Sequence, residues 1–254
     1  MSMPGAAAVR IPPFADDDFS RVLCVVAHPD DVEYGTSSAV AAWTSRGIDV
    51  AYLLLTRGEA GMDALTPDRT RELRTREQQR ACDVVGVSDL TMLDHPDGVL
   101  EYGLPLRRDI ARHIRRFRPD VLLTASPELT VGMGRGRRFL NQADHRVVGL
   151  AVLDAVRDAG NRWIFPELLD EDLQPWAGVT DVYLVGALEP TYAVDVTHTL
   201  PAGIDSLRAH RAYLDGLGRD FDPDQFLRAV TAGAGQALGV QHAIALGRIQ
   251  LQGV

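Results

Sequence analysis

A histidine and two carboxylates follow the first apolar segment of the chain, and side chains of these types can bind a metal ion or move protons. Residues 22–27 form a short apolar run rich in β-branched residues, and His28, Asp30 and Asp31 come directly after it. Such a run is typical of a strand that is buried on both faces. Because an open α/β sheet carries its chemistry at the carboxyl ends of its strands, this position favours a functional site.

The spacing of His28 and Asp31 is compatible with a shared metal ion, because residues three apart in a turn that opens a helix can point at one centre. A catalytic zinc ion usually takes three protein ligands from His and carboxylate and keeps one position for water. His145 is the best third donor, since its helix follows the fourth expected strand and its loop meets the first loop at one sheet edge. In a second explanation, Asp30 or Asp31 caps a helix and binds no metal. On spacing alone both explanations stay open.

The elements that must position these residues alternate along the chain. Strands are expected at residues 22–27, 49–56, 90–93 and 121–124, and helices at residues 36–46, 70–85, 106–117 and 143–160. Four strand–helix repeats predict an α/β fold with a doubly wound, mostly parallel, Rossmann-like sheet. The C-terminal part, from about residue 180 to 254, is less regular, with strands expected at 182–187 and 192–196 and one amphipathic helix at 201–217.

Two segments are expected to lack regular structure. Residues 1–18 are interpreted as an N-terminal arm, since they contain no apolar core typical of a signal peptide. Residues 125–141 are interpreted as a long loop that holds three glycines and three arginines. The loop superficially resembles a phosphate-binding loop, but it does not run directly from strand to helix, so a lid with a local positive patch fits better. Arg135 in this loop is a candidate contact for an anionic part of a substrate.

Composition limits the class of protein. The 254 residues, 46% of them hydrophobic, suffice for one sizeable core, and we interpret residues 1–254 as a single domain. The net charge of −9 argues against nucleic acid or an anionic membrane as partner, because no positive field gathers phosphates. No segment approaches the ~20 apolar residues that span a bilayer. Cys24 and Cys82 fall in an expected buried strand and helix, which favours a cytoplasmic protein with reduced thiols.

Four motifs occur in order along the chain: Ala-His-Pro-Asp-Asp-Val-Glu at 27–33, Thr-Arg-Gly-Glu-Ala-Gly at 56–61, Asp-Gly at 97–98, and Asp-His-Arg at 144–146 with Gly149. They resemble the motifs of the LmbE-like (PIG-L type) metal-dependent N-deacetylases. The helix that contains Arg74, Arg76 and Glu77 also resembles the second helix of that family. The resemblance covers most of the chain and implies a zinc-dependent N-deacetylase of the LmbE-like fold. It implies Zn²⁺ or another divalent metal as cofactor and a small N-acetylated substrate, an amino sugar or a glycosylated metabolite.

The resemblance also implies roles for the motif residues. His28, Asp31 and His145 would hold the metal, and Asp30 would stay free as general base. Zinc activates water and polarises the acetyl carbonyl, while Asp30 takes the proton of the water and passes it to the departing amine. Asp144, next to His145, is expected to accept a hydrogen bond from the imidazole of His145 and fix its tautomer.

One position departs from the family pattern. Gln142 stands where family members commonly have a histidine that stabilises the oxyanion or protonates the amine. A glutamine amide can donate a hydrogen bond to an oxyanion but cannot shuttle a proton. Either Asp30 carries both proton transfers, or another residue such as His95 contributes, or the activity is reduced; we favour Asp30.

Substrate contacts and alternative functions complete the interpretation. Glu59, Arg74 and Asp97 are candidate substrate contacts, with structural roles in their loops and helix as the alternative. The alternative enzyme function is that of a thiol-conjugate amidase of the same family. A non-catalytic small-molecule-binding protein on the same scaffold is the alternative from another class, and Gln142 gives it weight. The sequence leaves a homo-oligomer open.

Overall fold

A seven-stranded sheet forms the centre of the protein. The structure, a computed structural model, describes residues 11–14, 18–132, 138–179, 181–218 and 220–251. The strand order is β3-β2-β1-β4-β7-β9-β8. The strands are β1 (Arg21–Val26), β2 (Asp49–Leu54), β3 (Asp89–Met92), β4 (Val121–Ala125), β7 (Asp181–Val185), β8 (Tyr192–Asp195) and β9 (Ala243–Gln250). Neighbours from β3 to β7 pair in parallel, whereas β9 is antiparallel to β7 and β8. The expected α/β fold with a mostly parallel sheet is confirmed.

Strand β1 lies inside the parallel part of the sheet and is buried on both faces. Its side chains alternate between two cores, with Val22 and Cys24 in one and Leu23 and Val25 in the other. Because neither face meets water, every position along the strand can be apolar, and the residues at its carboxyl end are left to carry polar groups.

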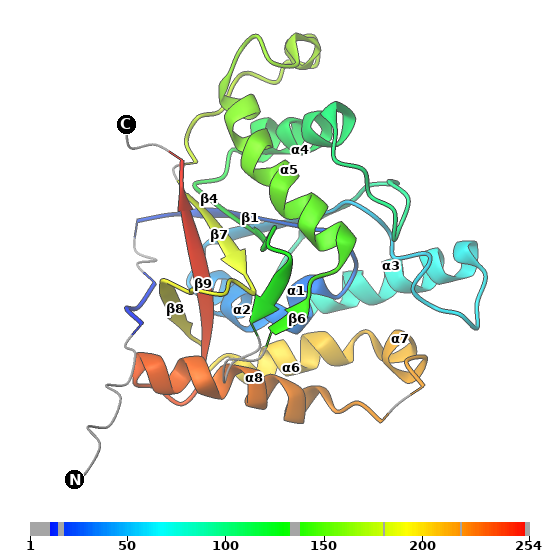
Figure 1. Ribbon diagram of the computed structural model, residues 1–254, viewed down its shortest axis with the longest axis vertical. Helices are drawn as coiled ribbons and strands as arrows, with labels where there is room; N and C mark the ends of the chain where they lie inside the picture. The colour runs from blue at the N-terminus through cyan, green and yellow to red at the C-terminus, as the bar shows by residue number, and fades with distance from the viewer. Residues whose placement is uncertain (1–10, 15–17, 133–137, 180, 219, 252–254) are drawn as a thin grey trace.

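Helices cover both faces of this sheet (Figure 1). Helices α4 and α5 pack on one face, and α2, α3, α6 and α8 lie on the other. The helices are α1 (Asp31–Gly35), α2 (Ser37–Ser45), α3 (Pro67–Val84), α4 (Leu104–Phe117), α5 (Ala143–Gly160), α6 (Leu200–Arg208), α7 (Arg211–Asp215) and α8 (Pro223–Leu238), with a short 3₁₀ turn at Pro166–Leu169. Among the described residues, no helix has the length and apolar character needed to cross a membrane.

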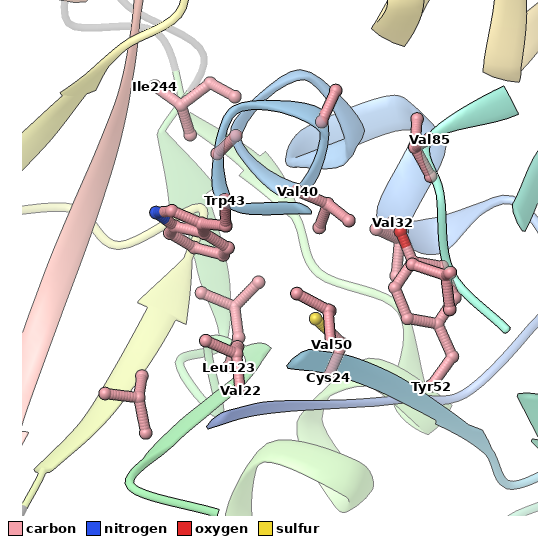
Figure 2. Packing of buried hydrophobic residues seen from close by; sticks show 14 of the residues in the cluster. Val22, Cys24, Val32, Val40, Trp43, Val50, Tyr52, Val85, Leu123 and Ile244 are labelled. Carbon is pink, nitrogen blue, oxygen red and sulfur yellow. The ribbon is translucent and has the colours of Figure 1, made fainter. Parts of the chain in front are cut away.

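Trp43 fills the core between α2 and the sheet (Figure 2). Its side chain is fully buried and lies in the same cluster as Val22 and Leu123 on the strands beneath it. The ring of Phe14 is 5.9 Å from the ring of Trp43 and only 6% of Phe14 is exposed. The end of the expected N-terminal arm is therefore packed, because Phe14 covers this core and its N–H donates to the carbonyl of Ala193 on β8.

Two expected elements were wrong in detail. The helix expected at 36–46 is confirmed as α2, and a short helix that was not expected, α1, precedes it. The helix expected at 201–217 is divided into α6 and α7 around His210, whose side chain is fully buried. A hydrophobic period shows which face of a helix is buried but does not show a short break in the helix. The loop expected at 125–141 contains β5 (Thr130–Gly132) and β6 (Arg138–Leu140), which pair antiparallel.

The C-terminal segment belongs to the sheet and to its helical cover. Helix α8 begins at a cap in which the Asp222 carboxylate accepts a hydrogen bond from the N–H of Asp224, and it ends before Gly239, whose φ of 91° suits glycine. Strand β9 then inserts between β7 and β8. Cys24 and Cys82 are both free and buried, as their expected strand and helix predicted.

Candidate metal centre

The turn after β1 is held by the second of its two aspartates. One carboxylate oxygen of Asp31, Oδ2, accepts hydrogen bonds from the backbone N–H groups of Ala27 (3.0 Å) and His28 (2.9 Å). Asp30 stands at the N-cap of α1 in a left-handed conformation, with φ of 88°, and its side chain makes no cap hydrogen bond. Neither carboxylate caps the helix that follows, so helix capping does not account for the His-Pro-Asp-Asp pattern.

The structure brings His28, Asp31 and His145 together. One ligand atom from each residue lies within 4.8 Å of the ligand atoms of the other two. His145 Nε2 is 3.0 Å from Asp31 Oδ1, and His28 Nδ1 is 3.5 Å from Asp31 Oδ2. His145 comes from the first turn of α5, which begins beside the carboxyl end of β4. Residues more than a hundred positions apart therefore converge at one edge of the sheet, as expected for this fold.

The other ring nitrogen of His28 faces two carboxylates. His28 Nε2 is 3.1 Å from Asp97 Oδ1 and 3.3 Å from Asp144 Oδ2. Asp144 is fixed in turn by the backbone N–H groups of Gly98 and Leu100, at 2.8 and 3.1 Å. The expectation that Asp144 pairs with its neighbour His145 was wrong. Adjacent residues in a helical turn point in different directions, and Asp144 turns inward to the loop after β3.

These residues fit a divalent metal. Two imidazoles and one carboxylate form a donor set typical of catalytic zinc sites, and carboxylates on the far nitrogen of a ligating histidine fix its tautomer. Burial lowers the pKa of His28, but Asp31, Asp144 and Asp97 outweigh burial and raise that pKa to about 12. Burial disfavours the charged form of Asp31, yet the imidazoles of His145 and His28 hold the pKa of its carboxyl well below its usual range. The cluster thus concentrates negative charge where a cation would lie.

Asp30 is close to this cluster but is held differently. Its backbone N–H donates to Gln78 Oε1 at 3.0 Å, and its Oδ2 is 3.1 Å from Arg74 Nη2. That contact is an ion pair without hydrogen-bond alignment, so Oδ2 has no hydrogen-bond partner among the described residues. Burial raises the pKa of Asp30 to about 6, although the Arg74 guanidinium acts in the opposite direction. A buried carboxylate with a free lone pair and this pKa can accept a proton from water near neutral pH.

Two of the candidate substrate contacts connect loops to one another. The Asp97 carboxylate accepts a hydrogen bond from the N–H of Ala60 at 2.8 Å, and the Glu59 carboxylate accepts one from the N–H of Asp97 at 3.2 Å. These reciprocal bonds join the loop after β2 to the loop after β3. Asp97 also faces His28, so its observed contacts are with other groups of the protein.

The remaining candidates lie in several places. Arg74 is buried beside Asp30. Gln142 is the N-cap residue of α5, exposed, and its side chain makes no cap hydrogen bond. His95 directs Nε2 to Asp109 on α4, at 3.1 Å, and is outside the cluster that forms around His28. Arg135 lies outside the described residues.

Sequence reasoning missed a polar stripe on α3. Arg74, Glu77 and Gln78 are buried in line with Ala81 and Cys82. Spacings of three and four residues place all five on one face of the helix. Val84, in the last turn of this helix, is apolar but exposed. A buried helix face that carries charge is a signal for a site, but residues 68–80 are polar at nearly every position, so the sequence does not mark which polar face is buried.

The fold and this cluster define a class of protein. A candidate His₂-carboxylate donor set at the carboxyl edge of a doubly wound sheet, with a further carboxylate beside it, fits a metal-assisted hydrolase. Residues 23–156 match the model of the PIG-L family, described as GlcNAc-PI de-N-acetylase. This match covers more than half of the chain, and the protein belongs to that family.

Two relatives agree with this assignment, and a solved structure shares the fold. The chain is 29% identical over 233 residues to the diacetylchitobiose deacetylase of Thermococcus kodakarensis, covering 89% of this chain and 82% of the relative. It is 31% identical over 253 residues to the 1D-myo-inositol 2-acetamido-2-deoxy-alpha-D-glucopyranoside deacetylase of Kineococcus radiotolerans, covering 76% and 69%. The N,N'-diacetylchitobiose deacetylase of Pyrococcus horikoshii has the same fold, with a TM-score of 0.80, 23% identity and coverage of 92% and 85%.

Proposed function

We propose that this protein is a metal-dependent N-deacetylase that removes an acetyl group from an amino sugar or a glycoside of one. The observation that carries the proposal is the convergence of His28, Asp31 and His145, with Asp30 next to them and outside the ligand set. The relatives named above are deacetylases of N-acetylated sugars, which supports an amino-sugar substrate.

His28, Asp31 and His145 would hold the metal, and we propose Zn²⁺ as the native ion. When bound, the ion supplies a Lewis acid that acidifies water and polarises the acetyl carbonyl. Asp97 and Asp144 accept from His28 Nε2, which would leave Nδ1 free to bind the ion.

Asp30 moves the protons of the reaction. Its Oδ2 accepts the proton of the attacking water and then delivers it to the departing amine nitrogen, so that the C–N bond breaks as a neutral amine leaves. The other product is acetic acid, which loses its proton to water and becomes acetate. Gln142, at the start of α5, is proposed to donate an amide N–H to the oxygen of the acetyl group as negative charge develops there.

The direct test measures acetate release from N,N'-diacetylchitobiose and from N-acetylglucosamine glycosides. We expect turnover after metal-free protein is loaded with Zn²⁺, and none after treatment with a chelator. If the protein binds metal stoichiometrically but releases acetate from none of these sugars, the result would instead support a non-catalytic small-molecule-binding protein. Release of a larger acyl group from thiol conjugates would support the amidase.

Replacement of Gln142 tests the oxyanion donor. Gln142→Ala is expected to lower kcat by about 10²-fold, because one lost donor to a developing oxyanion typically costs that much. Gln142→His should retain most of the activity, since an imidazole also donates. Steady-state kinetics on the preferred sugar measure both variants. If Gln142→Ala has the kcat of the wild type, the role proposed for this amide is wrong.

A further inference from the structure

The C-terminal segment reaches the candidate site through α7, and one aromatic ring makes the contact. We propose that Tyr213 is a positioning residue that holds the Arg74 guanidinium against the carboxylate of Asp30. This inference rests on the proposed function, because it assigns to Asp30 the proton transfers of the deacetylation. It gives the C-terminal segment a part in the active site.

Arg74 is placed to orient Asp30. Only 3% of Arg74 is exposed, its Nη1 donates to the carbonyl of Gly58 at 3.1 Å, and its Nη2 donates to the carbonyl of Pro29. The same Nη2 is 3.1 Å from Asp30 Oδ2. Two backbone carbonyls on either side of the site thus fix the plane of the guanidinium while it pairs with the carboxylate. With these contacts the buried Arg74 side chain can hold Asp30 in position.

The glycine loop after β2 closes over the guanidinium. A Cβ atom on Gly58 would lie 2.2 Å from Arg74 Nη1, and a Cβ atom on Gly61 would lie 2.6 Å from the same atom. Gly58 also has a φ of 64°, which residues other than glycine rarely adopt. A side chain at either glycine of the Thr-Arg-Gly-Glu-Ala-Gly motif would therefore displace the Arg74 guanidinium from its present position.

The ring of Tyr213 also lies against the guanidinium. Arg74 Cζ is 4.0 Å from the centroid of this ring, within the range of a cation–π contact. The position of the ring is set by α7, because the backbone N–H groups of Ala212 and Tyr213 donate to the Glu77 carboxylate at 2.7 and 3.3 Å. Glu77 is fully buried on the same face of α3 as Arg74. Helix α7 is therefore hydrogen-bonded to α3, the helix that carries Arg74.

The consequence is a chain of contacts from α7 to the proton-transfer group. The guanidinium is planar, and a flat ring on it restricts its rotation away from Asp30. Without the ring, Arg74 can turn within the space left behind, and Asp30 loses its fixed partner. Small displacements of a catalytic group reduce the rate of the chemical step more than they reduce substrate binding.

The test compares two replacements of Tyr213. Tyr213→Leu is expected to lower kcat by about 10- to 100-fold, with KM and bound zinc within about twofold of the wild type. Tyr213→Phe keeps the ring and should retain kcat. Tyr102→Leu is the matched control, since Tyr102 is 44% exposed and bonds Asp154 on the surface. Equal loss of kcat in Tyr213→Phe and Tyr213→Leu, or a rise in KM alone, would overturn the proposal.

A spectroscopic measurement tests the contact without turnover. The Nε–H resonance of Arg74, assigned by its loss in Arg74→Lys, should show the upfield ring-current shift of a proton over an aromatic face. The shift is expected to persist in Tyr213→Phe and to disappear in Tyr213→Leu, and an unshifted resonance in the wild type contradicts the contact. If the wild type releases no acetate while the shift behaves as expected, the proposed function fails and the Tyr213–Arg74 contact stands.

Discussion

Asp30→Asn is expected to lower kcat by about 10²–10⁴-fold while the protein keeps its bound metal, and Asp31→Asn is expected to lose the metal. The two aspartates are adjacent, and the substitution is the same, but their surroundings differ. Asp31 faces both imidazoles of the cluster, whereas Asp30 Oδ2 lies beside Arg74 and has no hydrogen-bond partner among the described residues. An amide at position 30 preserves the shape of the side chain and removes its ability to take a proton.

Acetate release and metal content after dialysis measure this difference on the same samples. Asp49→Asn is a suitable control, since Asp49 starts β2 at the opposite edge of the sheet and its side chain is 58% exposed. Equal loss of metal in Asp30→Asn and Asp31→Asn contradicts the division of roles. Unchanged turnover in Asp30→Asn removes Asp30 as the base.

Trp43→Ala is expected to reduce the free energy of unfolding by about 3–5 kcal/mol, the usual cost of truncating a buried aromatic side chain. Trp43 is fully buried between α2 and the sheet (Figure 2). The rings of Phe14 and Phe19 each lie 5.9 Å from its ring. Its indole N–H has no hydrogen-bond partner among the described residues, so the loss comes from packing and from the cavity left behind. Urea unfolding followed by circular dichroism gives the free energy.

The same substitution at an exposed tryptophan is the matched control. Trp163 is 76% exposed, and Trp163→Ala should change the free energy of unfolding by no more than about 0.5 kcal/mol. Equal effects at the two positions would show that Trp43 does not lie in the core described here. Metal content should be unchanged in Trp163→Ala.

The sequence by itself determined the parallel half of the sheet and the first part of the candidate site. Residues 22–27 are apolar at every position because β1 is covered on both faces, and this pattern is visible within six neighbouring residues. The polar residues at the end of that strand, and the helix that presents His145, follow from the same local patterns. The strand ends of such a sheet meet at one edge, so the convergence of His28 and His145 could be expected.

Other contacts of the site were decided only by the tertiary structure. The Asp144 side chain points to His28 and to the loop after β3. Its position next to His145 in the sequence does not predict this direction. The break between α6 and α7 places Tyr213 on Arg74, although 139 positions separate them in the sequence. Periodicity reports which face of a helix is buried, because that depends on neighbours three and four residues away. Periodicity carries no information about which distant segment covers that face. For the same reason, the position of β9 between β7 and β8 could not be predicted from the sequence.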